Sequence, residues 1–248
     1  MSIIYEIVPA LWDEWIVFKR NWFKITSSAI IAPVLYIIAF GFGVSGGFSI
    51  KGVTYIKFLI PGIIALTTMN ASYRAIAIIL NTNRNYDKTF EQFLIAPISM
   101  TSFVISKAIA GSLRGAYAGF IVLMISMVFG VRINVNLTFV LVMLLSGLTF
   151  SCLGMFGALV VKSHADMTRF GTYVMLPMTF LCGTFFSVDN LPYVFKSIIY
   201  IFPLTHISFM LRSIASYQPF YLINLLIVLG YFVLFFSLCI WRCKKVSA

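Results

Sequence analysis

Residues 137–161 read LTFVLVMLLSGLTFSCLGMFGALVV, twenty-five positions without one charged side chain. A helix needs about 20 apolar residues to cross the hydrocarbon core of a bilayer, so this stretch predicts a transmembrane helix. The apolar run is continuous rather than alternating, which argues against the strands of a membrane β-barrel.

The whole chain shares this apolar character. Of its 248 residues, 61% are apolar and only 10% are charged, whereas an average soluble domain has about 25% charged residues. We therefore predict an all-α, polytopic membrane protein with six transmembrane helices and no soluble domain. The six stretches that qualify are residues 26–45, 58–80, 105–130, 137–161, 171–188 and 220–241.

The first 25 residues carry charges and do not resemble a cleavable signal peptide. Apolar side chains recur there every three or four positions: Ile4, Ile7, Val8, Leu11, Trp12, Trp15 and Trp22. This spacing predicts an amphipathic helix lying in the membrane interface. The alternative is a cytosolic leader packed on the bundle.

A second irregular region separates the fifth and sixth predicted spans. Residues 191–216 read LPYVFKSIIYIFPLTHISFMLRSIAS and could be mistaken for a seventh span. Pro203 divides the stretch into pieces of about 10 to 13 residues, which are too short to cross a bilayer. We predict a broken, re-entrant helical hairpin over about residues 189–216.

The distribution of Lys and Arg predicts the orientation. With six spans both termini share one side, and eleven basic residues fall on that side, counting Lys107 at the start of the third span. The opposite side has five: Lys51, Lys57, Arg132, Lys196 and Arg212. Cytoplasmic loops carry the excess of basic residues, so we expect both termini, with the tail 242–248, in the cytoplasm and the chain in the inner or plasma membrane. The net charge of +11 fits contact with anionic lipid, and we expect no nucleic-acid partner.

Several kinds of chemistry have no support in the sequence. We place the seven acidic residues outside the spans, so no carboxylate is expected at mid-membrane depth to bind a coupling ion. No catalytic or metal-ligand spacing occurs, and no GxxxxGK[ST] phosphate loop is present. We expect no catalytic residue, metal or cofactor in this chain, and ATP and Mg²⁺ would be bound by another polypeptide.

The polar segment NTNRNYDKTFEQFLIAPIS, residues 81–99, separates two apolar runs. Four of its apolar residues fall at i, i+3, i+4 and i+7: Phe90, Phe93, Leu94 and Pro97. Asp87 can cap a short helix over about 87–97, Pro97 ends it, and Glu91 lies off the apolar face. Since isolated helices this short are marginal, the apolar face packs either on the membrane or bundle, or in a groove on a soluble partner.

Four pieces of sequence, taken in order, carry a resemblance over almost the whole chain: YIKFLIPGIIAL, RNYDKTFEQFLIAPIS, GSLRG and LPMTFLCGTFFSVDNLPYVFKSIIYIFPLTHISFMLR. The chain resembles the permease subunits of ATP-binding-cassette exporters, the type-two permeases, in their nodulation-factor and drug-exporter branch. The resemblance implies a homodimer with two copies of a separate ATPase subunit. It also implies that the helix at 87–97 is the coupling helix, which contacts the ATPase through Asp87, Phe90, Glu91, Phe93, Leu94 and Pro97.

Two basic residues lie inside predicted spans, Arg74 and Arg114. They either snorkel to the interface or bind backbone carbonyls, or they face a cavity and attract an anionic group. Gly111 and Gly115 beside Arg114 form a GxxxG pair that permits close helix approach.

Polar, aromatic and methionine side chains in two spans suit an adaptable transport pathway. The second span offers Thr67, Asn70 and Tyr73, and the fifth offers Thr172, Tyr173, Met175 and Met178. Phe185 and Phe186 could close the exit as an apolar plug, although plain helix packing explains each of these residues equally well.

The sequence thus predicts the permease half of an exporter for an amphipathic small molecule, a lipid or a glycan. The alternative is an ATP-independent channel or facilitator.

Overall fold

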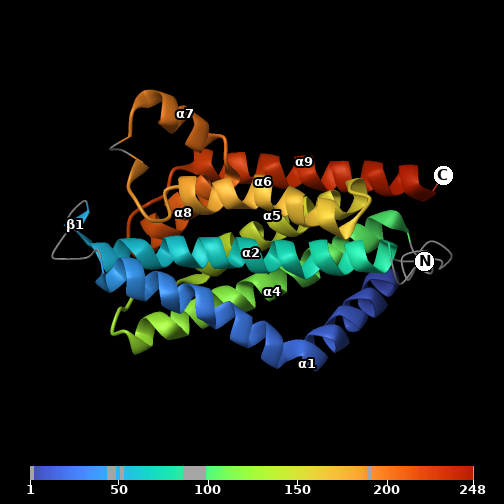
Figure 1. Cartoon of the computed structure of the whole chain (residues 1–248), viewed down its shortest axis with the longest axis horizontal. Coiled ribbons are helices and arrows are strands. Elements are labelled where there is room, and N and C mark those ends of the chain that lie inside the picture. Colours follow the sequence, from blue (N-terminus) through green and yellow to red (C-terminus); the bar gives the residue numbers. More distant parts are fainter. Residues whose placement is uncertain (1–2, 44–48, 51–52, 86–98, 189–190, 248) are drawn as a thin grey trace.

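The structure, a computed structural model, describes residues 3–43, 49–50, 53–85, 99–188 and 191–247. The chain forms a bundle of long helices that run roughly along one axis (Figure 1). The long helices are α1 (Ile3–Tyr36), α2 (Tyr55–Asn85), α4 (Met100–Val128), α5 (Leu137–Val160), α6 (His164–Leu181) and α9 (Leu222–Ser247). The shorter elements are the π-helix η1 (Ile37–Phe42), the helices α7 (Tyr193–Tyr200) and α8 (Pro203–Ala215), and the paired two-residue strands β1 (Ser49–Ile50) and β2 (Val53–Thr54).

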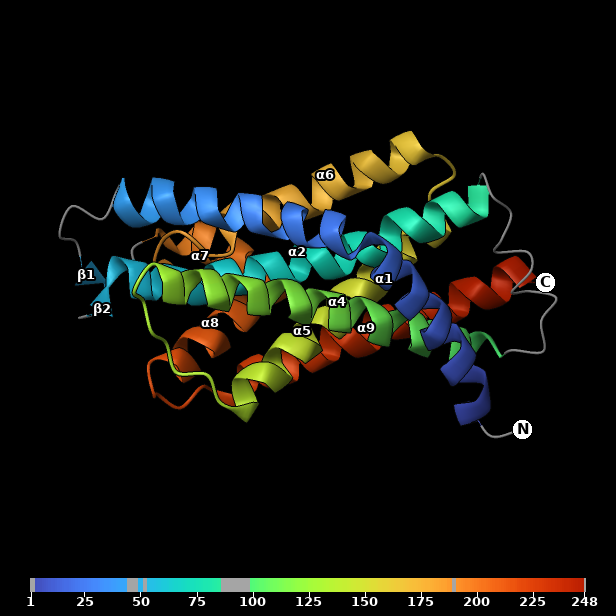
Figure 2. The ribbon, with the colours of Figure 1, turned by 90° about the horizontal axis from the view of Figure 1, so that it is seen from below.

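Within the described chain, five helices are long and apolar enough to cross a membrane: α1 with η1, α2, α4, α5 and α9. Their length and composition confirm the predicted all-α, polytopic fold. Both the start of α1 and the end of α9 lie at one end of the bundle (Figures 1 and 2), which we call the terminal end. The opposite end carries α7 and the strands, and we call it the hairpin end.

The fifth predicted span, residues 171–188, has the wrong boundaries. Helix α6 begins seven residues earlier because the Ser163 hydroxyl caps it, accepting a hydrogen bond of 3.1 Å from the backbone N–H of Asp166. The helix ends at Leu181, and Gly183 just beyond it has a positive φ of 69°. A left-handed backbone angle suits glycine and terminates a helix.

The predicted break in the region before α9 is confirmed. Helices α7 and α8 are separated by two residues and bend by 92°, and Pro203 is the first residue of α8. His206 stabilises the bend, since its Nε2 lies 2.9 Å from the carbonyl of Tyr200 and its Nδ1 lies 2.9 Å from Oδ1 of Asn224 in α9. The histidine is buried and joins three helices, as expected for a structural residue.

Helix α1 differs from its prediction. The sequence suggested an interfacial helix over 1–25 and a separate span from residue 26, yet α1 is continuous from Ile3 to Tyr36. It bends sharply between an N-terminal arm and a longer arm beside α2 (Figures 1 and 2). Trp12, Trp15 and Trp22 are more than half exposed, and their position in the membrane interface stays a prediction.

Helices α2, α4 and α5 pack most closely, because glycines and small polar residues let their backbones approach. A Cβ added at Gly115 would lie 1.8 Å from Oγ of Ser72, and one at Gly111 would lie 2.2 Å from Oγ of Ser151. The GxxxG pair therefore does face neighbouring helices, with Gly115 against α2 and Gly111 against α5.

We expect Gly115→Ala to weaken this packing, because the added methyl group overlaps both the Ser72 hydroxyl and the carbonyl of Thr68, 2.9 Å away. Overpacking of this kind costs about 1–3 kcal/mol of unfolding free energy, which unfolding in mixed detergent micelles measures. Gly230→Ala in α9 is the matched control, since nothing lies within 4 Å of its added Cβ. An equal loss in both variants would contradict the packing assignment.

Candidate transport groove

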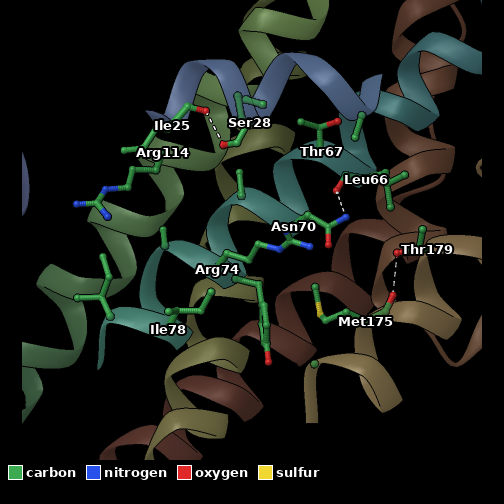
Figure 3. Close-up of a pocket in the computed structure, with 18 of the residues that line it drawn as sticks. Ile25, Ser28, Leu66, Thr67, Asn70, Arg74, Ile78, Arg114, Met175 and Thr179 are labelled. Atoms are coloured by element: carbon green, nitrogen blue, oxygen red, sulfur yellow. Dashed lines mark hydrogen bonds between the residues drawn. The ribbon is translucent and has the colours of Figure 1, made fainter. Parts of the chain in front are cut away.

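A groove with a volume of about 820 Å³ lies between α1, α2 and α6, and α4 contributes Arg114 and Ala118 to it. Figure 3 shows Ser28 of α1, Arg74 of α2 and Met175 of α6 on three sides of this space. The volume falls in the range of sites that hold a drug-sized ligand, about 300–1,000 Å³.

The groove brings together seven of the residues singled out from the sequence, five from α2 and α4 and two, Thr172 and Met175, from α6. Thr67, Asn70, Tyr73, Arg74 and Arg114 all line it. Thr67, Asn70 and Tyr73 are spaced three residues apart on α2, and Arg74 lies four residues after Asn70. These four residues therefore share one side of that helix. Their part in transport stays a prediction.

The other four predicted pathway residues do not line the groove. Tyr173 is 76% exposed, whereas Met178 is buried in the core. On α6 the lining comes from Thr172 and Met175, which the sequence analysis also named, and from their neighbours on the same face. Phe185 and Phe186 lie beyond the end of α6, where Phe185 is buried and Phe186 packs against the core.

The polar groups of α2 in the groove are only partly satisfied. The Asn70 amide donates a 3.0 Å hydrogen bond to the carbonyl of Leu66, one turn earlier. The Tyr73 hydroxyl is buried and finds no hydrogen-bond partner in the described part of the chain. Arg74 is exposed to the groove, and no described carboxylate pairs with it. Helix α2 therefore presents unsatisfied polar groups toward the space.

Arg114 is held by an acidic residue that the sequence analysis missed. Its Nη2 lies 2.7 Å from Oε2 of Glu14 in α1 and also donates a 3.0 Å hydrogen bond to the backbone carbonyl of Glu14. Oε1 of Glu14 pairs with Lys107, which lies seven residues before Arg114 on α4. All three side chains are at least 93% buried.

The sequence analysis placed all acidic residues outside the spans and gave Glu14 no role. Glu14 belongs to the continuous helix α1. It is one of the few buried residues of this helix and lies on the side that faces α4. A buried carboxylate is stable only when it is paired, and two cations here share one anion. The network ties the N-terminal arm of α1 to α4 and positions Arg114 at the groove wall.

At the terminal end, a second arginine anchors α2. Arg84 donates hydrogen bonds of 2.8–3.4 Å to the carbonyls of Ala158, Leu159 and Val161, the free acceptors at the end of α5. Arg242 of α9 adds a 3.4 Å bond to the carbonyl of Leu159. A cation at a helix C-terminus is also favoured by the helix dipole.

The start of α4 is anchored in the same region. Ser99 caps the helix, since its hydroxyl accepts from the N–H of Ser102, and its own N–H donates a 2.9 Å bond to Glu6 of α1. Residues 86–98 between these anchors, and with them Asp87, Phe90, Glu91, Phe93, Leu94 and Pro97, lie outside the described residues.

At the hairpin end, aromatic rings close over the groove. Phe185 stacks on Phe40 with ring centroids 4.6 Å apart, and it contacts Tyr36 and Phe180 at 5.2 and 6.3 Å. Tyr36 and Phe180 themselves line the groove, so the cluster forms its end.

Backbone contacts fix this aromatic cluster. The Tyr55 hydroxyl donates a 2.8 Å hydrogen bond to the carbonyl of Phe185. Arg212 of α8 donates to the carbonyls of Phe58, Gly183 and Thr184 at 2.7–3.1 Å, and its guanidinium covers the Phe58 ring. The segment after α6 is thereby tied to α2 and α8.

Membrane-length helices around a polar, partly cationic groove define a multi-pass membrane transport protein. A family model for ABC-2 type transporters matches residues 5–216, and the chain belongs to this family. The resemblance inferred from sequence is thereby confirmed, and the chain is a membrane transport permease rather than an enzyme by its relatives.

Two groups of relatives cover most of the chain. The inner membrane transport permease YadH of Escherichia coli (strain K12) is 24% identical over 209 residues, which cover 83% of this chain and 81% of that protein. Nodulation protein J of Rhizobium meliloti (strain 1021) is 29% identical over 224 residues, covering 86% and 85%. Nodulation protein J of Rhizobium leguminosarum bv. viciae is 28% identical over 223 residues, covering 86% of each chain.

We expect Glu14→Gln to destabilise the protein strongly, since it removes the buried carboxylate that both Lys107 and Arg114 contact. Removing one partner of a buried ion pair costs about 3–5 kcal/mol. Arg169→Gln is the control, because the Arg169–Asp166 pair is exposed and such pairs contribute at most about 0.5 kcal/mol. Unfolding midpoints in the same detergent give the comparison, and similar midpoints for the two variants would refute the structural role of the network.

Proposed function

We propose that this chain is the permease subunit of an ATP-driven exporter, working as a dimer with a second copy of itself and with two copies of a separate ATPase subunit. It resides in the inner or plasma membrane with both termini in the cytoplasm. Its substrate passes along the groove between α1, α2 and α6. ATP and Mg²⁺ are bound by the ATPase subunit, because this sequence has no phosphate-binding loop.

The observation that carries the proposal is the connection between the groove and both flanks of residues 86–98. On one flank, α2 supplies the groove residues Asn70 and Arg74 and continues as one helix to Asn85. On the other flank, Ser99 is hydrogen-bonded to Glu6 at the start of α1, the helix that forms the opposite wall. A force applied to the segment reaches two walls of the groove through continuous helices.

The two flanks of residues 86–98 are held by different numbers of contacts, so a movement of this segment displaces one helix more than the other. Arg84 makes three hydrogen bonds to α5 and fixes the end of α2 on the closely packed α2–α4–α5 core. The start of α1 is held by Glu6, which accepts the hydrogen bond from Ser99, and by the Glu14 pair. When the segment moves, α1 shifts relative to this core, and the groove changes width.

Nucleotide drives such a cycle only through its different affinity for the two states of the dimer. The rival function, an ATP-independent facilitator, gives residues 87–97 no partner and predicts transport without nucleotide. Reconstitution of the permease with and without its ATPase subunit separates the two, because the facilitator moves substrate down its gradient in both cases.

We expect Phe93→Asp to abolish association with the ATPase subunit, since a charge replaces an aromatic anchor on the apolar face of the coupling helix. Co-purification of the two subunits and the ATPase rate of the complex measure the effect, and we expect both to fall at least tenfold. Membrane insertion should be unchanged, because the segment lies between spans.

Tyr217→Asp is the matched control. Tyr217 is also an exposed aromatic residue, 82% exposed, but it lies in the loop after α8 at the hairpin end. This variant should keep the ATPase subunit bound. If Phe93→Asp retains a normal complex with normal turnover, the coupling assignment is wrong.

A further inference from the structure

The groove is amphipathic along its length, and this property indicates what it binds. Its lining includes the cations Lys24, Arg74 and Arg114, and no Asp or Glu belongs to the lining within the described ranges. The chain as a whole has eleven more basic than acidic residues, but few of them reach a membrane-depth cavity. Ionisable residues at such depth mark binding sites when they face a cavity, because their desolvation is costly.

The three cations lie at a common level of the bundle. Gly115, next to Arg114, packs against Ser72, which is close to Arg74 on α2. Thr26, close to Lys24 on α1, shares a 2.7 Å hydrogen bond with Tyr117, one turn beyond Arg114 on α4. These contacts bring three helices together at one height. Figure 3 shows that Arg74 extends toward Asn70, whereas Arg114 extends to the opposite side, where it meets Glu14.

Arg74 has free hydrogen-bonding capacity within the described residues. It lies about 16 Å along the helix from Asn85, at a rise of about 1.5 Å per residue, and none of the described carboxylates pairs with it. Arg114 is held by Glu14 through Nη2 and only 7% of its side chain is exposed, so it contributes positive charge to the wall. The buried, unpaired hydroxyl of Tyr73 adjoins Arg74. Figure 3 shows Asn70 and Arg74 extending into the same space.

Toward the hairpin end the lining becomes apolar. Pro33 and Tyr36 of α1, Leu66 of α2, and Leu176 and Phe180 of α6 form this part. An apolar tail would gain free energy by leaving water for this surface. The groove therefore offers a cationic half and an apolar half, arranged along its axis.

We propose that the groove binds an amphipathic anion, a molecule with a phosphate or carboxylate headgroup and an apolar tail. Arg74 holds the headgroup with help from the Asn70 amide beside it, Lys24 adds positive charge to the lining, and the tail lies against Leu66, Leu176 and Phe180. Guanidinium groups suit this task because their planar donors match phosphate and carboxylate oxygens. The inference names a substrate class for the groove and in that sense rests on the proposed function.

The test uses the full chain in phosphatidylcholine nanodiscs, without the ATPase subunit. Dodecyl phosphate and dodecylphosphocholine serve as probes, because they share the tail and the phosphate but only the first has a net negative charge. Equilibrium binding should show at least a tenfold preference for dodecyl phosphate. Inorganic phosphate should bind at least a hundredfold more weakly, since it lacks the tail.

Variants assign the preference to the groove. Arg74→Gln should remove the preference for the anionic probe, and Arg74→Lys should retain part of it while controlling for folding. Lys57→Gln is the matched control, because Lys57 is an exposed basic residue that lines a separate pocket near Arg132 at the hairpin end. This variant should bind as the wild type does.

A competition arm identifies the source of the anion. Displacement of dodecyl phosphate by phosphatidylglycerol would assign the headgroup to a membrane lipid, and failure to displace it would assign a single-chain amphiphile. Both results support the proposed class.

Three outcomes would overturn the inference: equal affinity for the two probes, an equal effect of Arg74→Gln and Lys57→Gln, or loss of the dimer in Arg74→Gln with binding unchanged. The last result would mean that a second copy fills the groove. Since this assay needs no nucleotide, it is independent of coupling. If Phe93→Asp keeps the ATPase subunit, the proposed function fails while the binding class can still stand.

Discussion

The groove depends on one buried carboxylate. Glu14 faces both Lys107 and Arg114, and this shared pair is the ionic contact that holds the N-terminal half of α1 against α4. Without it, α1 would be a mostly exposed helix, with isolated buried positions such as Ala10 and Pro33. Helix α1 forms one wall of the groove. The Glu14 ion pairs near the N-terminus of α1 therefore help to set the position of this wall relative to α2 and α6.

The remaining walls depend on close packing. Lipid removes the hydrophobic drive between helices, so association relies on van der Waals contact and hydrogen bonds between small residues. Gly111, Gly115 and Gly147 each have a neighbouring serine within the distance that a side chain would occupy. This core of α2, α4 and α5 is rigid, whereas α6 has fewer neighbours and contacts chiefly α2 and α5. The groove thus lies between a rigid core and two less constrained helices, α1 and α6.

The sequence predicted the core helices well and the groove only in part. Long apolar runs dominate the energetics in a membrane, so 137–161 and 105–130 match α5 and α4 closely. Polar residues within the second predicted span, such as Asn70 and Arg74, lie on the α2 wall of the groove. On α6 the groove is lined by Thr172 and Met175 but not by Tyr173 and Met178, since a run rich in apolar residues on every side does not show which face is inward.

The α1 wall could not be predicted from local pattern. Glu14 and Arg114 are a hundred residues apart, and nothing in the periodicity of either segment relates them. The predicted span 171–188 left out the polar start of α6. The helix begins earlier because Ser163 and Asp166 form capping hydrogen bonds with each other. Both errors come from tertiary or capping contacts that hydropathy does not register. For residues 86–98 the expected role comes from the sequence alone, because these residues lie outside the described part of the chain.

The two ends of the groove are closed by different interactions, which bears on how it could open. At the hairpin end, the aromatic cluster around Phe185 is fixed by hydrogen bonds to backbone carbonyls from Tyr55 and Arg212. Such bonds persist only while the segment after α6 keeps its backbone conformation, including the left-handed Gly183. At the terminal end, by contrast, long ionic side chains from α1 and α4 meet, and these tolerate small helix shifts without breaking. In this structure the hairpin end of the groove is therefore covered by an aromatic cluster that is tied to α2 and α8, whereas α1 is held near the terminal end by ion pairs to α4.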